Sequence, residues 1–348
     1  MKEVTALGLF SGGLDSILAC RVIMAQGIRV VALKFVTPFF DDALLRRQEE
    51  YRAGVQEKYG IDVRIVDLSE GYIELLRDPK HGYGKHFNPC VDCKIFLLRR
   101  ARALMNEYGA SFLITGEVLG QRPMSQRRDT LRVIERESGC EDILLRPLCA
   151  KLLVETQPER EGQVDRHKLL AFSGRGRRRQ MNLAADFGIG QYPSPAGGCI
   201  LTDPNLAARI EHYYQGRINL AAADLQVNDI RLLLVGRQFR LPDGSWFVLG
   251  RDEKENSRIE DLAGGADWLF HMPERPGPTG LLRRAGIRVA GSASEQDVIR
   301  ACAGLVVRYG RKNKGRIEPG EVLLNRGDEQ CMIMAEPLDD ALFSGWQF

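Results

Sequence analysis

The sequence predicts an α/β fold, a doubly wound parallel sheet followed by a smaller α+β domain. The first observation is a series of apolar, strand-like runs that alternate with helical segments, at residues 4–10, 29–36, 61–68 and 110–117. The second is a change after about residue 200 to short alternating runs around Asp243-Gly244, a hairpin signal. At 348 residues the chain is long enough for two domains, which we expect at 1–200 and 201–348.

Composition narrows the class of protein. The chain is 44% hydrophobic and 27% charged, which is typical of soluble proteins. Its formal net charge is only +3, so binding to a polyanion would depend on local basic segments. The start, MKEVTALGLF, lacks the apolar region of a signal peptide, and no long uncharged run follows, so we expect a cytoplasmic protein without membrane association. Eight cysteines in this setting favour reduced thiols or metal ligands over disulfides.

The first strand, residues 4–10, leads through Ser11-Gly12-Gly13 into a helical pattern that starts at Leu14 and can stop at Gly27. Glycines at such a turn let backbone N–H groups approach a ligand, and a helix N-terminus favours an anion. The turn therefore predicts a phosphate cradle, although a purely structural turn is the alternative. It is not the lysine-containing P-loop, because no lysine follows.

The next elements extend the same pattern. Residues 29–36 and 61–68 read as strands, separated by a charged amphipathic helix at 41–60. A helix at 93–109 then precedes the strand at 110–117. Parallel sheets bind ligands beyond the carboxyl ends of their strands. We expect the first loop, the turn after Thr37 and Gly116-Glu117 to converge there.

Three cysteines stand out by spacing. Cys90 and Cys93 form a C-x-x-C pair, and Cys199 ends a Gly-Gly-Cys turn. A single C-x-x-C is compatible with half a zinc site, a redox pair or part of an iron–sulfur site. His81 or His86 could complete a zinc site, although no second C-x-x-C exists. Cys20, in the first helix, is predicted to be core.

The segment SGGLDS, residues 11–16, resembles the signature of the PP-loop ATP pyrophosphatases. This resemblance implies an adenine nucleotide α-hydrolase-like domain that splits ATP between the α- and β-phosphates and adenylates a carbonyl or carboxyl oxygen. It also implies that Asp15 is catalytic and helps to place Mg²⁺. The residues that the resemblance assigns to ATP binding are Ser11, Gly12, Gly13, Asp15, Ser16, Gly116 and Gln121.

The cysteines resemble those of the tRNA-thiolating branch. The 2-thiouridine synthase (MnmA) type has cysteines that match Cys93 and Cys199, which are implied to be catalytic. Some thiolases add a third, matching Cys90, and hold a [4Fe–4S] cluster by three thiolates with one iron open to sulfide. We therefore expect a [4Fe–4S] cluster on Cys90, Cys93 and Cys199, with zinc or a bare cysteine pair as alternatives.

Residues 113–148, with TGE-V-LGQ, SQ and RPL, resemble the 4-thiouridine synthetase (ThiI) type, which modifies position 8 of tRNA. The chain departs from that type in two ways. With its nucleotide loop at Ser11, it leaves no room for the N-terminal RNA-binding THUMP region. No rhodanese-like C-terminal segment is evident either.

RNA binding is predicted from two basic segments and a second resemblance. Residues 229–280 resemble the NFACT-R RNA-binding module. Lysines and arginines also gather at 166–180 and, around Tyr309, at 306–316, where they could neutralise phosphates. A solvated basic loop is the alternative for 166–180. The predicted RNA-binding residues are Arg175, Arg177, Arg178, Arg179, Lys312 and Lys314.

Together these features predict an ATP-dependent tRNA sulfurtransferase. It would adenylate a uridine carbonyl and replace the oxygen with sulfur, forming 4-thiouridine at position 8. The sulfur would come from free sulfide, a cysteine desulfurase or a sulfur carrier. The alternatives are a 2-thiouridine synthase that uses a cysteine persulfide, a PP-loop small-molecule amide ligase, and a non-catalytic RNA-binding protein.

Overall fold

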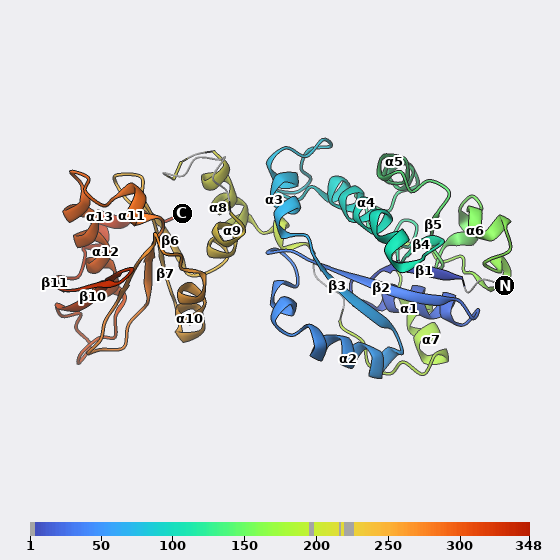
Figure 1. The fold of residues 1–348 in the computed structure, drawn as a ribbon, viewed down its shortest axis with the longest axis horizontal. Helices are drawn as coiled ribbons and strands as arrows, with labels where there is room; N and C mark the ends of the chain where they lie inside the picture. The colour runs from blue at the N-terminus through green and yellow to red at the C-terminus, as the bar shows by residue number, and fades with distance from the viewer. Residues whose placement is uncertain (1–3, 195–197, 216, 219–225) are drawn as a thin grey trace. The chain divides into compact units, whose positions relative to one another are not determined.

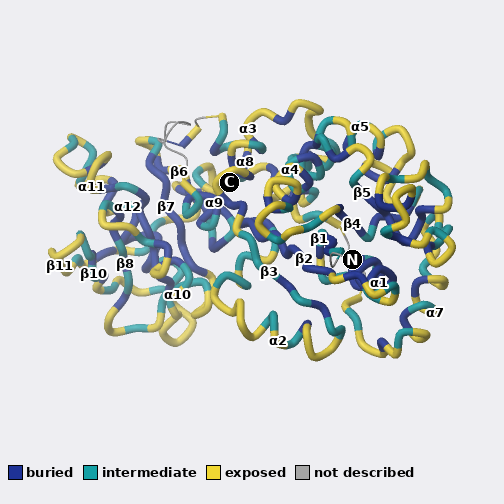
Figure 2. Tube along the Cα trace, turned by 45° about the vertical axis from the view of Figure 1, so that its right-hand side comes forward, coloured by how far each residue is buried: buried dark blue, intermediate teal, exposed yellow. Residues whose placement is uncertain are grey.

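The computed structural model describes residues 4–194, 198–215, 217–218 and 226–348 (Figure 1). The chain divides into two compact units, Met1–Thr202 and Asp203–Phe348. Each unit has its own sheet and its own apolar core, and buried residues follow the strands of both (Figure 2).

The first unit is built on a five-stranded parallel sheet in the order β3-β2-β1-β4-β5. β1 lies in the centre, with Thr5 opposite Arg29 of β2 and Ala6 opposite Phe112 of β4. The predicted doubly wound parallel sheet is therefore confirmed. The strands are β1 (Thr5–Leu9), β2 (Arg29–Val36), β3 (Asp62–Asp67), β4 (Phe112–Thr115) and β5 (Leu144–Leu145).

Helices cover both faces of this sheet, with α3, α4 and α5 on one side and α1, α2 and α7 on the other (Figure 1). Successive residues of a strand point to opposite faces. Accordingly, Ala6 packs in the core with Ile17 of α1, and Leu7 in the core with Leu98 of α4. The helices are α1 (Leu14–Met24), α2 (Gln48–Tyr59), α3 (Ser69–Arg77), α4 (Cys90–Tyr108), α5 (Arg128–Ser138), α6 (Gln157–Arg160) and α7 (Arg178–Asp186).

Two predicted helices have different bounds in the structure. The helix predicted at 41–60 is wrong in its first third, where a 3₁₀ turn (Asp42–Arg46) precedes α2. Asp41 has left-handed backbone (φ 61) and its carboxylate pairs with Lys34 Nζ at 2.5 Å, which stops a regular helix from starting there. The helix predicted at 93–109 begins earlier, at Cys90 after Pro89. Cys90 and Cys93 therefore lie one turn apart on the same side of α4.

The second unit contains a six-stranded antiparallel sheet in the order β11-β10-β8-β9-β7-β6. The predicted hairpin at Asp243-Gly244 is confirmed, since β6 and β7 pair there and Gly244 has φ 87. Its strands are β6 (Arg237–Arg240), β7 (Trp246–Leu249), β8 (Trp268–His271), β9 (Gly280–Leu282), β10 (Gly320–Arg326) and β11 (Glu329–Ala335). Its helices are α8 (Pro204–Tyr214), α9 (Val227–Leu233), α10 (Glu253–Leu262), α11 (Ala285–Arg288), α12 (Glu295–Tyr309) and α13 (Asp340–Phe343).

A buried ion network ties the helices of this unit to its sheet. Asp229 of α9, fully buried, accepts hydrogen bonds from Arg283 Nε at 2.7 Å and Arg284 Nη2 at 2.9 Å. Tyr213 of α8 donates to the same carboxylate at 2.8 Å. Arg283 also bonds Asp267 at 2.6 Å, so each buried charge in the network has an opposite partner.

All eight cysteines are free thiols, as predicted from their number and setting. Cys20 is buried in the core of α1, again as predicted. None of the helices in the described part of the chain has the length and apolar content needed to span a bilayer.

Candidate active site

The turn between β1 and α1 is arranged as an anion cradle. Gly12 has φ 83, a conformation that favours glycine. Ser16 Oγ donates to the Gly13 carbonyl at 2.7 Å and lies 3.2 Å from Ser11 Oγ. Gly13 caps α1 with extended backbone and receives no side-chain cap, so the first N–H groups of the helix remain available to a ligand.

Lys34 of β2, which sequence analysis did not select, holds this turn by a hydrogen bond to its backbone. Its side chain is buried in β2, and Nζ donates to the Ser11 carbonyl at 2.7 Å. The ammonium also lies 5.9 Å from the ring centre of Tyr51. A lysine within the apolar strand 29–36 was the feature of the sequence that could have marked Lys34 as functional. Its positive charge sits directly behind the loop that would hold phosphates.

A cavity of about 330 Å³ opens beside the turn. Phe10 and Gly12 line it from the turn, and Tyr51 and Val55 line it from α2. Burial, with the nearby Asp41 carboxylate, raises the pKa of Tyr51 to about 12, so its hydroxyl stays protonated. The lining thus combines apolar side chains with the tyrosines Tyr51 and Tyr59 and with charged residues, which are Arg47, Glu50 and Lys58.

Asp15 and Gln121 meet behind the turn. Gln121 Nε2 donates to Asp15 Oδ2 at 2.9 Å, although the two residues are 106 positions apart. Asp15 Oδ1 and Gln121 Oε1 are both buried, and neither has a hydrogen-bond partner among the described residues. Buried oxygens without partners are unfavourable, so this pair is suited to receive a donor or a cation.

Gly116, at the end of β4, contacts the backbone of α1. A Cβ atom at this position would lie 2.5 Å from the Asp15 carbonyl carbon and 2.6 Å from Ser16 N. Gly116 is therefore a packing position for the nucleotide turn, and its predicted contact with ATP stays a prediction.

Replacing Gly116 by alanine is expected to destabilise the first unit by about 2–3 kcal/mol, because the backbone at Asp15 must move. The midpoint of thermal unfolding should fall by about 5–10 °C. Gly54→Ala is the matched control, since nothing lies within 4 Å of a Cβ there. Equal midpoints for the two variants would contradict the packing role.

A buried charge network connects the end of β4 to α4. Glu117 accepts from Arg146 Nε at 3.0 Å, and Lys94 Nζ lies 3.5 Å from its second oxygen. Burial alone would raise the pKa of Glu117, but Lys94 and Arg146 lower it below its usual value, so the carboxylate stays ionised. Because Lys94 follows Cys93, the network reaches the C-x-x-C pair.

The three selected cysteines lie close enough for the pKa values of Cys93 and Cys199 to depend on neighbouring thiols. Burial raises the pKa of Cys93 to about 11; the Tyr72 hydroxyl hydrogen-bonds this thiol and Lys94 lies near, and both oppose the rise. Cys90 and Cys199 each raise it further. Burial likewise raises the pKa of Cys199, with Cys90 adding to the effect. The structure therefore brings the three thiols into one electrostatic environment.

Thiolates of Cys90, Cys93 and Cys199 are the type of ligand that binds an iron–sulfur cluster. Within the described ranges, no three His, Cys, Asp or Glu side chains already surround a common metal position. His81, the alternative zinc ligand, instead pairs through Nδ1 with Asp92 Oδ1 at 2.9 Å. Tyr72, buried among aromatic rings on α3, is a residue that sequence analysis missed, since no motif marks it.

One loop, residues 118–127, joins the nucleotide turn to the cysteines. Gln121 bonds Asp15, and the charge of the next residue, Arg122, partly opposes the rise that burial causes in the pKa of the Cys199 thiol. Met124 packs against Gly84 in the segment before α4. The loop is closed by Gly120 N, which donates to the Gln126 carbonyl at 2.7 Å. The loop therefore contacts the nucleotide turn through Gln121, and the charge of Arg122 acts on Cys199.

The predicted basic segment starts at this same loop. Gly174 N donates to the Leu119 carbonyl at 2.8 Å, and α7 follows at Arg178. Arg175, Arg178 and Arg179 are exposed, whereas Arg177 is half-buried. In the second unit, Lys312 and Lys314 are exposed in the segment after α12.

Comparison with known families agrees with this geometry. Residues 2–152 match the family described as thiamine biosynthesis protein (ThiI). The first unit carries a ThiI domain. Residues 236–346 match the NFACT protein RNA binding domain, so the ThiI domain is followed by an RNA-binding module. The resemblances to ThiI and to NFACT-R are thereby confirmed.

Relatives of this ThiI-containing chain include the tRNA sulfurtransferase of Marinobacter nauticus, 31% identical over 151 residues, which are 42% of this chain and 29% of the relative. A probable tRNA sulfurtransferase of Thermococcus kodakarensis is 25% identical over 133 residues, 38% of this chain and 34% of the relative. The chain thus spans about a third of the length of these relatives.

Among solved structures, a 4-thiouridine synthetase–RNA complex with bound ATP is similar at 19% identity and a TM-score of 0.34. That similarity covers 53% of this chain and 52% of the other. At this TM-score it carries no argument about function.

Proposed function

We propose that the chain is a cytoplasmic, ATP-dependent tRNA sulfurtransferase that forms 4-thiouridine at position 8 of tRNA. The observation that carries the proposal is the 118–127 loop, because it contacts Asp15 of the nucleotide turn and lies within electrostatic reach of Cys199. ATP activation and sulfur delivery would thus take place on two sides of one loop. The ThiI domain, the RNA-binding module and the sulfurtransferase relatives support the same conclusion.

The nucleotide turn would bind the β- and γ-phosphates of ATP. Ser11, Gly12, Gly13 and Ser16 would supply hydroxyl and N–H donors at the start of α1. Lys34, which also pairs with Asp41, would hold the turn in place through the Ser11 carbonyl. Mg²⁺ fits at Asp15, whose buried Oδ1 has no partner among the described residues, and would neutralise phosphate charge there. The adjacent 330 Å³ cavity is the place we propose for the adenosine.

The chemistry then proceeds in two displacements. The uridine O4 attacks the α-phosphate, the bond to the bridging oxygen breaks, and pyrophosphate leaves on the nucleotide turn. Adenylation converts a poor leaving group into AMP. Sulfur delivered at Cys90, Cys93 and Cys199 then forms the C–S bond as the C–O bond breaks, and AMP departs with the oxygen. Holding sulfur and adenylate in one site raises their effective concentration.

The three thiols would hold a [4Fe–4S] cluster. Bound there, such a cluster would supply an open iron that keeps sulfide deprotonated and needs no net electron transfer. A route without metal is the second candidate, as in the 2-thiouridine synthase type: the outer sulfur of a Cys199 persulfide would attack the adenylated carbon and AMP would leave. The Cys93 thiolate would then attack Cys199 Sγ, breaking the S–S bond and releasing the thiouridine, and a dithiol reductant would reduce the resulting Cys93–Cys199 disulfide before the next turnover. The absence of a preformed ligand group among the described residues is the observation that favours retaining this candidate.

RNA would be held by basic residues of both units. The first of these residues are Arg175, Arg177, Arg178 and Arg179. They directly follow Gly174, which is hydrogen-bonded to Leu119 of the 118–127 loop. Lys312 and Lys314 extend the basic character of the NFACT-type module. The sulfur donor would be free sulfide, a desulfurase or a carrier.

Protein purified without oxygen tests the proposal. We expect a brown chromophore with about four irons per chain, lost in Cys90→Ser, and ATP–pyrophosphate exchange that tRNA stimulates. A colourless protein whose Cys90→Ser variant still thiolates tRNA would instead establish the persulfide route. Exchange that ignores tRNA, with no thiolated product, would overturn the proposed function.

A further inference from the structure

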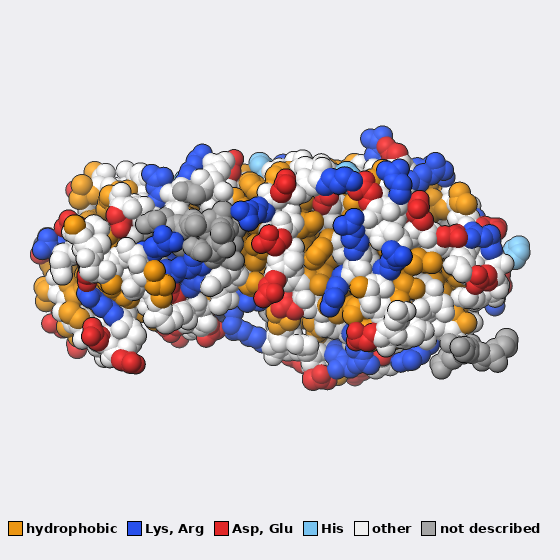
Figure 3. All heavy atoms as spheres, turned by 45° about the horizontal axis from the view of Figure 1, so that its top comes forward, with side chains coloured by type: hydrophobic (Ala, Val, Ile, Leu, Met, Phe, Trp, Pro, Cys, Tyr) orange, Lys and Arg blue, Asp and Glu red, His pale blue; other side chains and the backbone are white. Residues whose placement is uncertain are grey.

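A second basic strip lies on α5 and the loop that leads into it. Arg128, Arg132 and Arg136 recur every four residues, so they project from one side of the helix. Arg122 and Arg127 precede them, and all five side chains are exposed. Lys and Arg side chains also gather over this part of the first unit in the space-filling view (Figure 3). None of these arginines belongs to the basic segments that the sequence motifs single out.

Much of this charge is available to a partner. The guanidinium groups of Arg122 and Arg132 form no hydrogen bond or ion pair with any residue that the structure describes. Arg127 pairs with Asp129 at 3.5 Å, but both side chains are about 70% exposed, so this pair is weak. Glu135, on the same helix, instead forms an ion pair with the buried Arg146.

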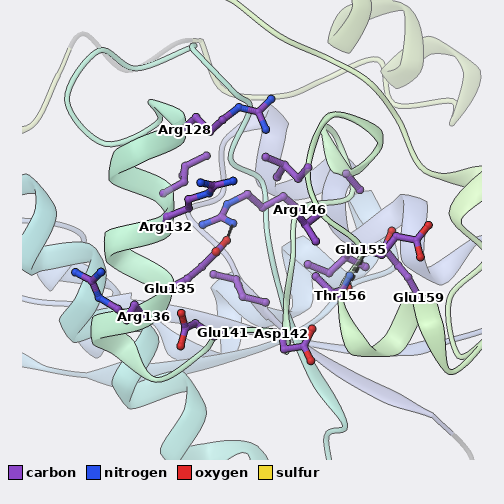
Figure 4. Close-up of a pocket in the computed structure, with 16 residues that line it drawn as sticks. Arg128, Arg132, Glu135, Arg136, Glu141, Asp142, Arg146, Glu155, Thr156 and Glu159 are labelled. Carbon is purple, nitrogen blue, oxygen red and sulfur yellow. Dashed lines mark hydrogen bonds and ion pairs between the residues drawn. The ribbon is translucent and has the colours of Figure 1, made fainter.

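A cavity of about 460 Å³ adjoins the strip (Figure 4). Arg128, Arg132 and Arg146 line it, and Arg146 is only 1% exposed. Nε of Arg146 binds Glu117 and Nη1 binds Glu135, whereas Nη2 is buried without a partner among the described residues. A buried N–H donor without an acceptor points to a ligand that supplies oxygen atoms.

Carboxylates also line this cavity, and most are already paired. Asp142 binds Arg160, and Glu155 and Glu159 both face Arg166. Arg128 and Arg132 themselves form no ion pair with these acids among the described residues.

We propose that Arg122, Arg127, Arg128 and Arg132 bind the phosphate backbone of the RNA and lead it along α5 to the three cysteines. The proposal rests on the proposed function, since it identifies how the RNA reaches that site. The strip runs over more than one helical turn, about 6 Å for each four residues. A single inorganic phosphate could engage only part of it, whereas a polymer of phosphates can engage all four arginines.

The test compares Arg122→Gln/Arg132→Gln with Arg122→Lys/Arg132→Lys in the full chain, with a tRNA transcript as the probe. Each lost phosphate contact should weaken binding about fivefold near 0.1 M salt, so we expect roughly a 25-fold loss for the glutamine pair. The slope of log K against log salt should fall by about 1.4. The lysine pair keeps both charges and should retain most of the affinity. Arg29→Gln, exposed at the amino end of β2, should leave affinity and slope unchanged.

Three results would overturn the proposed RNA-binding role of the strip. The glutamine pair could bind within twofold of wild type, the lysine pair could lose as much affinity as the glutamine pair, or the wild-type chain could fail to bind the transcript. These failures are distinguishable from failure of the proposed function. A wild-type chain that thiolates tRNA while the glutamine pair binds normally removes only the strip. Binding that depends on both arginines, without any thiolation, removes only the reaction.

Discussion

Replacing Cys199 by serine is expected to lower tRNA thiolation by about 1,000-fold or more, while ATP–pyrophosphate exchange continues. A serine hydroxyl neither carries a persulfide nor ligates iron as a thiolate does, so both proposed sulfur routes lose an essential group. The nucleotide turn does not contain Cys199, and its internal hydrogen bonds involve Ser11, Gly13 and Ser16 alone. Thiouridine content after digestion of the tRNA, measured beside the exchange rate, separates the two half-reactions.

Cys331→Ser is the matched control for this experiment. Cys331 is the exposed cysteine of β11, in the second unit, and should be replaceable without loss of thiolation. Thiolation by Cys199→Ser at the rate of Cys331→Ser would show that the sulfur does not pass through the three-cysteine site.

Replacing Asp229 by alanine is expected to destabilise the second unit by about 3–5 kcal/mol. The substitution removes the Asp229 carboxylate from both Arg283 and Arg284, whose side chains are only 4% and 11% exposed, and leaves Arg283 with Asp267 as its buried carboxylate partner. Tyr213 loses its acceptor as well. The thermal midpoint of this unit should fall by about 10 °C or more, measured by calorimetry, while the unfolding of the first unit stays in place.

Asp297→Ala controls for loss of an acid as such. Asp297 is 83% exposed and its pair with Arg300 spans 3.7 Å, so we expect a change within about 0.5 kcal/mol. If Asp229→Ala shifts the midpoint no more than Asp297→Ala does, the buried network does not stabilise the unit.

Local patterns were sufficient to predict the architecture. The run at 29–36 is β2 with the same bounds, because a buried parallel strand is apolar on both faces and cannot be mistaken for an amphipathic helix of that length. The Asp243-Gly244 hairpin followed from turn chemistry. The SGGLDS motif likewise located the turn between β1 and α1.

Contacts made by the folded chain were beyond such patterns. The 3₁₀ turn before α2 begins after Asp41, whose carboxylate pairs with Lys34 of β2, and ends at Arg47, where the backbone is not helical (φ −136). Periodicity alone extends a helix through that region. Arg122 sits in an unremarkable polar stretch, and its proximity to Cys199 arises from the packing of segments almost eighty residues apart. No local sequence pattern marks the pairing of Asp41 with Lys34 or the effect of Arg122 on Cys199, so both could be recognised only in the structure.

Gln121 contacts Asp15, and the charge of the next residue, Arg122, acts on Cys199. This arrangement has a consequence for the order of steps in the proposed reaction. Consecutive residues share a peptide unit, so a shift of one readily carries the other. Linkage is reciprocal: if sulfur loading alters the affinity for ATP by some factor, ATP alters the loading equilibrium by the same factor. In the proposed reaction, such a loop would let adenylation wait until sulfur is present, and ATP would then not be cleaved without forming product.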